Sequence, residues 1–565
     1  MELQIWMGRA GAGKSRLVLE TIEKRRGQRP QVLLVPEHAS HEAELDLCRA
    51  CGPTASRDAE VLSFRNLATR VLGQVGGLAD VTLDNGGKLL TMRRALQEVS
   101  GRLTVFARPS QRPAFLRQLV ALADELYAYR VTPEQLMAQV ADMDGAAGEK
   151  LRSAALIYGA YDARLRGDGF DARSRVQKLC DALPASDYLA GKDVYVDGFS
   201  YFNRVEEDIL ATALRQAESL TVTLLGDESD PQLFQNALRQ RERLKRMAAL
   251  VHSKCTVEVL VSKNDGALAH LERCFFGGEE PWQGEEPPVR LYQAETAFSE
   301  VEFVAAQVRR LAREGCRWRD IGVAARNMEV YGPLLEAVFR RDGIPAYISR
   351  RSDILEKPVL TMLLSAVDAV TGGFEYEDVF RCLKTGMAGI TAAECDVLEN
   401  YVIRWEIRGG MWLRETDWTA SPDGYGAELN EVRRQRLAEV NAVRRRVRGL
   451  FYDLSEGLKA GETVRDKAEV LYRFAESAGV PETLERQTAA LYDDGQVQLA
   501  EEYRQLWSIF CGVLDQFVEL LGDVEVDGQE FARLLRLVLS QYAVATIPAT
   551  LDQVKVTPIT RNDRH

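Results

Sequence analysis

The first fifteen residues contain the clearest chemical pattern of the chain. An apolar, β-prone stretch, Met1–Met7, is followed by the glycine-rich segment Gly8–Ser15, and a helical pattern opens directly afterwards. Gly8, Gly11 and Gly13 let the backbone fold around an anion with its N–H groups pointing inward. The N-terminus of the following helix adds a favourable dipole. Because strand and helix flank the loop, a chance glycine-rich turn is the weaker interpretation.

Two side chains of this segment have the chemistry to bind a nucleotide. The segment fits GxxxxGK[ST], the Walker A pattern, in which the lysine reaches the β- and γ-phosphates and the hydroxyl holds Mg²⁺. Lys14 and Ser15 occupy these two positions. The sequence therefore predicts ATP and Mg²⁺ as cofactors.

A second stretch predicts the carboxylate of the same site. The segment Asp193–Phe199 reads as a short apolar strand ending in Asp197, which is the Walker B form and places a carboxylate beside the metal. Hydrolytic members of the P-loop class usually carry a glutamate next, which activates water. Here the next residue is Gly198, and glycine cannot act as a base. Taken without the Walker A segment, a single strand-ending aspartate is weak support for a metal site.

The elements around these residues alternate between strand and helix, which predicts an α/β fold with a parallel sheet covered on both faces. Further strand-like stretches are Gln31–Pro36, Ala59–Phe64 and Leu220–Asp227. Ligands of such sheets bind at the carboxyl ends of the strands. The residues expected at this edge are Glu37, His38, Ser63, Phe64 and Arg65. A capped loop without a binding role is the alternative for each of them.

The pattern then repeats with long helical stretches between the strands. An acidic, Pro- and Gly-rich segment near 279–288 reads as a linker, and a second α/β pattern follows it, with strands expected at Val289–Tyr292, Ile321–Ala325 and Ala346–Ile348. We therefore expect two P-loop-type α/β domains, each with a helical insertion. The expected boundaries are 1–110 with 184–280 for the first domain, 111–183 for its insertion, 281–373 for the second domain, 374–545 for its insertion, and 546–565 for a return to the second sheet that is cut off.

Two basic features have an ordinary alternative. Arg326 ends the strand Ile321–Ala325 and so lies at a carboxyl edge, although surface arginines are common. The arginine-rich stretch 433–448 could contact phosphates. Because Glu439 lies within it and Glu431 just before it, a solvated helix face is the more ordinary explanation.

Bulk properties exclude several classes of protein. The 565 residues carry a net charge of -12, which argues against a surface coated in nucleic-acid-binding charge but leaves room for a local basic groove. No apolar run is long enough to span a membrane and no signal peptide precedes the first strand, so a cytoplasmic protein with reduced cysteines is expected. A zinc site at His38, His41, Cys48 and Cys51 is disfavoured, because one helix cannot close a tetrahedron around an ion.

The layout resembles that of UvrD-like superfamily 1 helicases. More specifically, the chain resembles the AddB subunits of the bacterial AddAB helicase–nucleases, through GRAGAGKS, LLVPE, VLSFRNLATRVL, VYVDGFSYF, and above all LENYV at 398–402 with IRGG at 407–410. The resemblance covers the whole chain and the N-terminal half or so of a typical family member. It implies that the C-terminal part of the second domain and the nuclease domain, with its iron–sulfur cluster, lie beyond His565.

The resemblance also implies roles for single residues. Arg326 matches the arginine of helicase motif IV and would touch the γ-phosphate. Single-stranded DNA would cross the tops of both sheets, and the residues expected to meet it are Glu37, His38, Phe64, Arg65 and Phe199. The implied partners are a motor subunit of the AddA type and DNA with single-stranded and duplex ends, while no nuclease residue is expected on this chain.

Three functions remain open on the sequence alone. The leading hypothesis is a helicase-like subunit that binds nucleotide and single-stranded DNA, scans the strand for a Chi-like regulatory sequence during recombinational repair of double-strand breaks, and has weak or no ATPase of its own. The second is an active superfamily 1 helicase motor, and Gly198 separates the two, because a missing base or arginine lowers the rate on the order of 10²–10⁵. The third, a kinase-like enzyme on a small substrate, fits the two-domain layout poorly.

Overall fold

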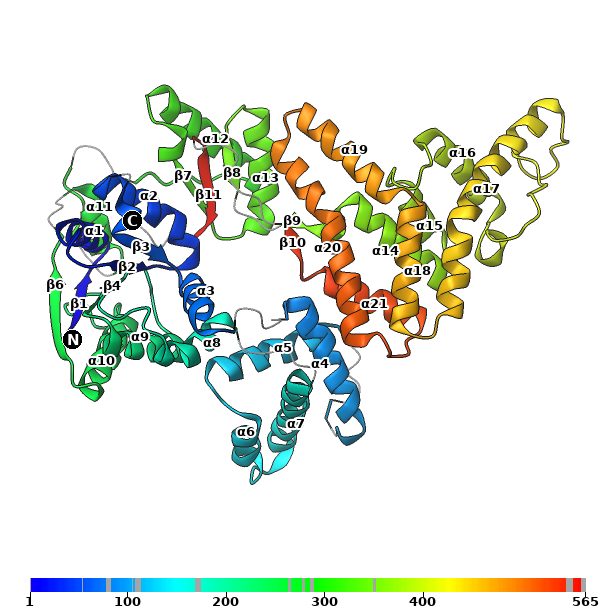
Figure 1. Cartoon of the computed structure of the whole chain (residues 1–565). Helices are drawn as coiled ribbons and strands as arrows, with labels where there is room; N and C mark the ends of the chain where they lie inside the picture. The colour runs from blue at the N-terminus through cyan, green and yellow to red at the C-terminus, as the bar shows by residue number, and fades with distance from the viewer. Residues whose placement is uncertain are drawn as a thin grey trace.

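The computed structural model of the chain describes residues 2–52, 54–77, 83–103, 105–106, 113–167, 174–262, 266–276, 280–284, 289–348, 352–544 and 552–559. A parallel six-stranded sheet lies in the N-terminal part (Figure 1). Its strands, in spatial order, are β3 (Ala59–Leu62), β2 (Gln31–Leu34), β4 (Asp193–Val196), β5 (Ser219–Leu225), β1 (Glu2–Gly8) and β6 (Lys254–Leu260). The α/β class and the parallel sheet predicted from the sequence are confirmed.

Helices cover both faces of this sheet, because its central strands are apolar on both sides. On one face, α1 (Lys14–Lys24) and α2 (Ser40–Cys51) bury side chains such as Val18 and Leu47. The other face is covered by α3 (Phe64–Val75), α8 (Arg175–Ala182), α9 (Arg204–Gln216) and α10 (Gln235–Leu250). The short α11 (Ala267–Cys274) follows β6 and has no buried residue.

A smaller parallel sheet follows, in the order β7 (Gly322–Ala325), β11 (Val554–Pro558) and β8 (Ala346–Ile348), with α12 (Ala297–Arg313) and α13 (Met328–Arg341) packed together beside it. The expected strand at 289–292 is wrong. These residues form no strand, and the side chain of Leu291 is 99% exposed. Apolar character alone does not make a strand, because a strand also needs a hydrogen-bonding neighbour. The salt bridge from Lys555 to Glu42, 2.8 Å long, connects this sheet to α2.

The remaining helices form two groups. The first group is α4 (Asn85–Val99), α5 (Pro113–Ala128), α6 (Pro133–Val140) and α7 (Gly145–Gly167). The second is α14 (Pro358–Thr371), α15 (Tyr376–Leu383), α16 (Ala392–Trp405), α17 (Glu431–Ala460), α18 (Val464–Ser477), α19 (Val480–Asp493), α20 (Val497–Leu521) and α21 (Gly528–Leu539), with the two-stranded pair β9 (Ser352–Asp353) and β10 (Ala543–Val544) at its ends. No described helix combines the length and apolar character needed to cross a membrane.

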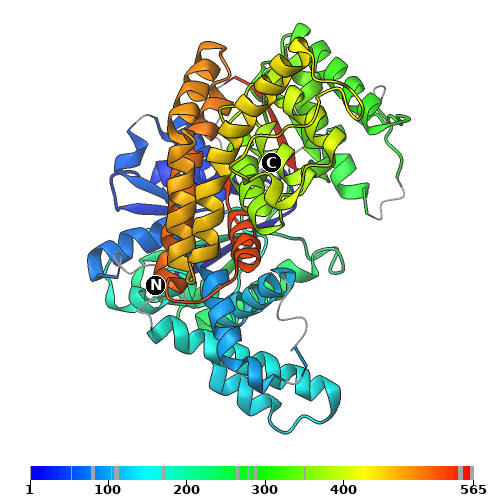
Figure 2. The ribbon, with the colours of Figure 1, turned by 90° about the vertical axis from the view of Figure 1, so that its right-hand side faces the viewer.

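One hydrophobic core joins the two helical groups. It runs without interruption from buried residues of α4, α5 and α7 to those of α14–α21. Figure 2 shows α21 close to α4, and α18 and α20 running side by side. Gly86 of α4 makes the close approach possible, since a Cβ on it would lie 2.9 Å from Cγ1 of Val538 and 3.0 Å from the hydroxyl of Tyr542. An ion pair between Arg93 and Glu530 spans the same junction.

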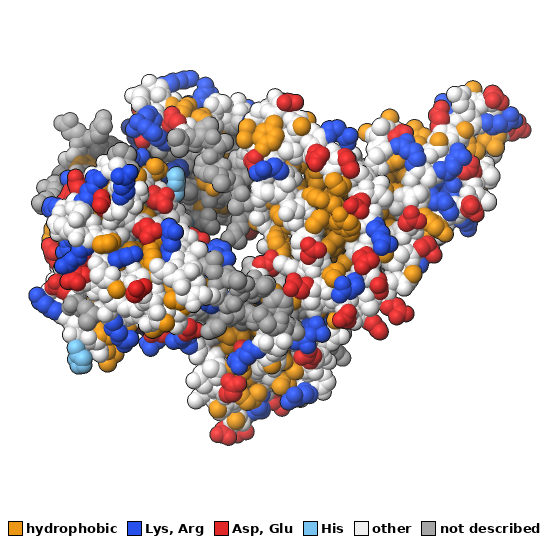
Figure 3. Space-filling model, viewed as in Figure 1, with side chains coloured by type: hydrophobic (Ala, Val, Ile, Leu, Met, Phe, Trp, Pro, Cys, Tyr) orange, Lys and Arg blue, Asp and Glu red, His pale blue; other side chains and the backbone are white. Residues whose placement is uncertain are grey.

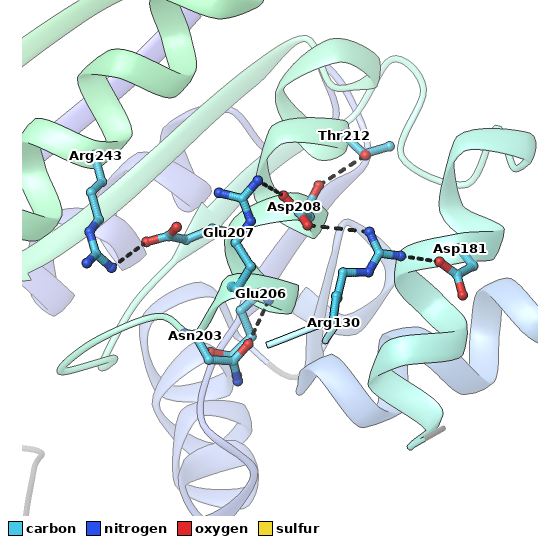
Figure 4. A network of polar contacts seen from close by, with 9 residues as sticks. Arg130, Asp181, Asn203, Glu206, Glu207, Asp208, Thr212 and Arg243 are labelled. Carbon is cyan, nitrogen blue, oxygen red and sulfur yellow. Dashed lines mark hydrogen bonds and ion pairs between the residues drawn. The ribbon is translucent and has the colours of Figure 1, made fainter. Parts of the chain in front are cut away.

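Polar contacts connect the first helical group to the sheet domain. Arg130, just after α5, forms ion pairs with Asp181 of α8 and, at 3.5 Å, with Asp208 of α9 (Figure 4). Arg130 has φ +57°, an unusual conformation for a residue with a side chain. On α9, Glu207 continues the network to Arg243 of α10, 3.3 Å away. The end of α5 is therefore held against the sheet domain from two helices.

Packing divides the helices differently from the expected boundaries. The insertion expected at 111–183 excludes α4, which belongs to the shared helical core, and includes α8, which packs against α3 and α9 beside the sheet. Similarly, α14 lies before residue 374 but packs within the helical core. Residues 111, 112 and 545–551 and most of the expected linker at 279–288 lie outside the described residues. The sequence pattern shows that a segment is helical but not which core it joins.

The close approach at Gly86 can be tested by adding a side chain there. Gly86→Leu would force α4 away from α21, and overpacking of this kind lowers the free energy of unfolding by about 1–3 kcal/mol. Gly512→Leu in α20 is the matched control, since a Cβ there meets nothing within 4 Å. Urea unfolding of both variants measures the difference, and amide exchange shows whether α21 loses protection with α4. Equal stability of the two variants would contradict the shared core.

Candidate nucleotide and DNA site

The glycine-rich loop between β1 and α1 needs its glycines for two different reasons. Gly11 and Gly13 have φ +74° and +83°, in the left-handed region that favours glycine. Gly8 is needed for space, because a Cβ on it would lie 2.7 Å from the carbonyl oxygen of Leu260 at the end of β6. Since α1 begins at Lys14, the loop leads directly into a helix N-terminus, as the sequence predicts.

The side chain of Lys14 folds back over this loop. Its Nζ donates hydrogen bonds to the carbonyl oxygens of Gly8, 2.8 Å away, and Arg9, 2.9 Å away. Burial lowers the pKa of Lys14, while the negative charges of Asp197 and Glu272 act in the opposite direction. The ammonium is thus held at the loop by acceptors that an incoming phosphate would exceed in charge.

The predicted Walker B carboxylate lies in a fixed position. Asp197 follows β4, is 3% exposed, and its Oδ1 accepts a hydrogen bond of 2.6 Å from the hydroxyl of Thr223 on β5. Thr223 therefore orients the carboxylate, a role that the sequence does not reveal. Ser15, in the first turn of α1, is exposed. The hydroxyl of Ser15 and the carboxylate of Asp197 are oxygen donors of the kind Mg²⁺ prefers, and with Lys14 they fit a magnesium nucleotide chemically.

Gly198 is more than the absence of a glutamate. Its φ is +81°, a conformation that residues with side chains rarely adopt. The chain turns sharply directly after Asp197, and a glutamate placed there would be strained as well as wrongly directed. The backbone itself is therefore built without the usual position for a general base.

Four residues around Arg9 extend the site beyond the predicted set. The Nε of Arg9 donates a 2.6 Å hydrogen bond to Asp227, its Nη1 lies 3.6 Å from Glu272, and its guanidinium lies 5.1 Å from the ring centre of Phe234. Burial alone would raise the pKa of Asp227, but the backbone N–H of Ser229 and the Arg9 side chain together lower it to about 2. A signal for this part of the site was available, since Lys254–Leu260 alternates between polar and apolar residues as an edge strand does.

The residues expected to meet DNA fall into two groups. Glu37 and Arg65 form an exposed ion pair of 3.3 Å, and His38 is exposed beside them. Phe64 is only 5% exposed, and its ring packs 5.3 Å from that of Phe199, which is itself partly buried. As packed here, Phe64 supports the edge of the sheet and has no free face on which a base could stack.

A different aromatic side chain is exposed at this edge. Tyr201, two residues after Phe199, is 69% exposed. It lies in the segment that connects β4 to α9, on the carboxyl side of the sheet. The motif VYVDGFSYF contains it, but the sequence does not reveal which of its three aromatic rings after Asp197 faces solvent. Tyr201 is therefore the stacking candidate that the tertiary structure selects.

The basic features have different surroundings. Arg326 directly follows β7 and is exposed, whereas its contact with a phosphate stays a prediction. Most arginines of α17 have protein partners: Arg433 pairs with Asp423, Arg446 with Glu394, and Arg444 is fully buried beside Trp418. Figure 3 shows charges of both signs interspersed over the visible face. The arginine-rich stretch therefore mainly serves the fold.

The segment LENYV packs inside the helical core. Leu398 is fully buried, and the ring of Tyr401 stacks on that of Trp418 with centres 5.1 Å apart and planes 1° from parallel. Glu399 is the surface residue of the motif and accepts hydrogen bonds from Tyr376 and, at 2.6 Å, Lys384. Among the described residues, no group of three or more His, Cys, Asp or Glu is placed to hold a metal ion, and in the α2 segment His38 is exposed whereas Cys51 is buried.

Comparison with known proteins agrees with the site. The family model described as "ADDB, N-terminal" matches residues 5–272, from β1 into α11. The chain belongs to the AddB family. Along its whole length this AddB-family chain is similar to curated proteins named as the AddB-type component of an ATP-dependent helicase/deoxyribonuclease. It is 34% identical to that of Desulforudis audaxviator and 32% identical to that of Acetivibrio thermocellus.

The relatives are longer than this chain. It covers 51% of each of these two proteins, and 50% of the corresponding protein of Caldanaerobacter subterraneus, to which it is 32% identical. The chain thus spans about half the length of the curated relatives it matches. Activities named for those proteins belong to the longer polypeptides.

The Arg9–Asp227 pair predicts a pH dependence of stability. The pKa of Asp227 is lower in the folded chain than its ordinary value of 3.8. Its stabilisation is therefore present above about pH 4 and is lost as the pH falls toward about 2. Asp227→Asn should lower the free energy of unfolding by roughly 1–2 kcal/mol near neutral pH, and the difference should shrink in acid.

Urea unfolding at neutral pH and at about pH 3 measures this difference. Asp46→Asn is the control, because Asp46 pairs with Arg49 on the exposed face of α2 and should change stability little. A difference between Asp227→Asn and the unchanged chain that grew in acid would contradict the direction of the pKa shift.

Proposed function

We propose that this chain is the helicase-like, ATP-binding and single-stranded-DNA-binding part of an AddB-type subunit of an ATP-dependent helicase/exonuclease. The single observation that supports it most is the combination of an intact phosphate loop with Gly198 at φ +81° directly after Asp197. Such a site has the groups that bind a magnesium nucleotide and lacks a place for the base that activates water. The chain binds ATP and hydrolyses it weakly or not at all.

In this proposal the two parallel sheets are two RecA-like domains. The six-stranded sheet carries Lys14 and Asp197, and the three-stranded sheet carries Arg326 at the carboxyl end of β7. The salt bridge between Lys555 and Glu42 places an element of the second sheet against α2. Arg326 is the residue by which the second domain would sense the γ-phosphate.

The shared helical core favours a holding role over a motor role. A motor of this layout moves by opening and closing its two α/β domains around a nucleotide. Here the helical groups attached to the two domains bury their side chains in one core, with Gly86 and the Arg93–Glu530 pair at the junction. Because packed cores resist gradual deformation, such a junction restrains relative movement of the domains. The partner, a motor subunit of the AddA type, drives translocation.

Single-stranded DNA would cross the carboxyl edge of the first sheet. Arg65 and His38 are exposed there for phosphates, and the ring of Tyr201 is available for a base. From this edge the protein would hold the strand and scan it for a Chi-like regulatory sequence, in cytoplasmic repair of double-strand breaks by homologous recombination. Cleavage of the strand is the work of residues outside this chain.

Lys14→Ala tests the division of labour. In a complex reconstituted from full-length subunits, the variant should keep unwinding within about twofold of the unchanged complex, because the partner supplies hydrolysis. The same variant should lose the rise in melting temperature that MgATP produces in the isolated AddB-type subunit. Lys24→Ala, an exposed lysine at the end of the same helix, is the control. Complete loss of unwinding would instead support an active helicase motor.

Tyr201→Ala tests the DNA path. Removal of a stacking ring weakens binding by about 1–3 kcal/mol per base, so the affinity for a short single-stranded oligonucleotide should fall correspondingly. Fluorescence anisotropy at low salt, where phosphate contacts are strongest, measures it. Tyr129→Ala is the matched control, since Tyr129 is 63% exposed on the first helical group. If both variants bound equally well, the path would not cross this edge.

A further inference from the structure

The Walker A pattern leaves the residue after Gly8 unspecified, yet in this chain that residue, Arg9, has the most partners of the loop. Its side chain is 19% exposed and contacts two carboxylates and one ring. The carboxylate of Asp227 lies 2.6 Å away and that of Glu272 3.6 Å away. An arginine so neutralised on both sides is not offered to solvent as a free cation.

The partners of Arg9 come from separate segments of the chain. Asp227 follows β5, Phe234 directly precedes α10, and Glu272 lies on α11. Asp227 is itself held, because its Oδ1 accepts a 2.9 Å hydrogen bond from the backbone N–H of Ser229. One side chain of the loop is thereby connected to the elements that follow β5 and β6, the two neighbours of β1 in the sheet.

The backbone of Arg9 also sets the shape of the loop. Its carbonyl oxygen accepts hydrogen bonds from Nζ of Lys14 at 2.9 Å and from the N–H of Ala12 at 3.2 Å. The neighbouring carbonyl of Gly8 accepts from Lys14 and from the N–H of Gly226, 3.2 Å away. Movement of Arg9 would therefore displace both acceptors of Lys14 and loosen the turn.

We propose that Arg9 is a positioning residue, which holds the phosphate loop in its binding shape through Asp227 and Glu272 before a nucleotide arrives. This inference rests on the proposed nucleotide binding. A loop ordered in advance loses less conformational freedom on binding, and the saved free energy appears as affinity. The segment from β6 to α11 then belongs to the nucleotide site, since Glu272 faces both Arg9 and the charge of Lys14.

A direct contact between Arg9 and a phosphate makes the opposite prediction for Asp227. If Arg9 only positions the loop, Asp227→Asn weakens nucleotide binding in the same direction as Arg9→Ala, and the double variant is no worse than Arg9→Ala. If Arg9 instead contacts phosphate, the loss of its carboxylate partner frees the guanidinium and the affinity stays the same or rises.

Calorimetric titration of the full-length protein with MgATP provides the first measurement. Arg9→Ala should weaken binding roughly tenfold, within the range that coupled neighbouring residues show. Arg9→Lys, which keeps the charge near Asp227 but not the fork that reaches both carboxylates, should restore part of the affinity. Arg16→Ala is the matched control, because the side chain of Arg16 is 84% exposed and pairs with Glu20 of its own helix.

Amide hydrogen exchange without nucleotide provides the second measurement and separates the two proposals. Arg9→Ala should speed exchange of the amides of residues 10–13 about tenfold, while exchange in β1 and the melting temperature stay close to those of the control. Failure of the unchanged protein to bind MgATP would overturn the proposed function, and faster exchange would still support the tether. Unchanged exchange in Arg9→Ala, or tighter binding by Asp227→Asn, would overturn the positioning role.

Discussion

The arrangement of this molecule depends on the parallel register of its six-stranded sheet. Because all six strands run in one direction, their carboxyl ends meet at one edge. Gly8, Asp197 and Asp227 come from strands that are far apart in sequence, yet this register places the segments that follow those strands beside one another. The phosphate loop, the metal carboxylate and the exposed ring of Tyr201 are therefore consequences of a single backbone constraint.

The helical core acts as a second constraint on the same site. Its two groups of helices enter the chain at different places, but they bury their apolar faces together. The contact is close at Gly86, where no side chain separates α4 from α21. At the other end, the Arg130 network holds the first group against the sheet domain. A protein with this construction is suited to hold a strand in one place while its partner pulls.

Within the site, each charged group is positioned by a neighbour from another element. Thr223 orients Asp197, Asp227 holds Arg9, and the carbonyls of the loop hold Lys14. Gly198 follows the opposite logic, since its left-handed conformation keeps a side chain away from the metal carboxylate. Binding and hydrolysis are thus separated by the shape of the backbone at one residue, and the same strand end supplies the carboxylate for the first and withholds the base for the second.

The sequence by itself determined the phosphate loop, the strand-ending Asp197, the α/β class and most strands, because these depend on local patterns of glycine and apolar residues. It misplaced a strand at 289–292, where apolar residues lack a hydrogen-bonding neighbour, and it offered Phe64 for stacking although the core buries that ring. Only the tertiary structure decided that Arg9 meets Asp227 and Glu272, that Tyr201 is exposed, and that both helical groups share one core. These facts depend on contacts between residues hundreds of positions apart, and no local pattern in a single chain records which surfaces will meet.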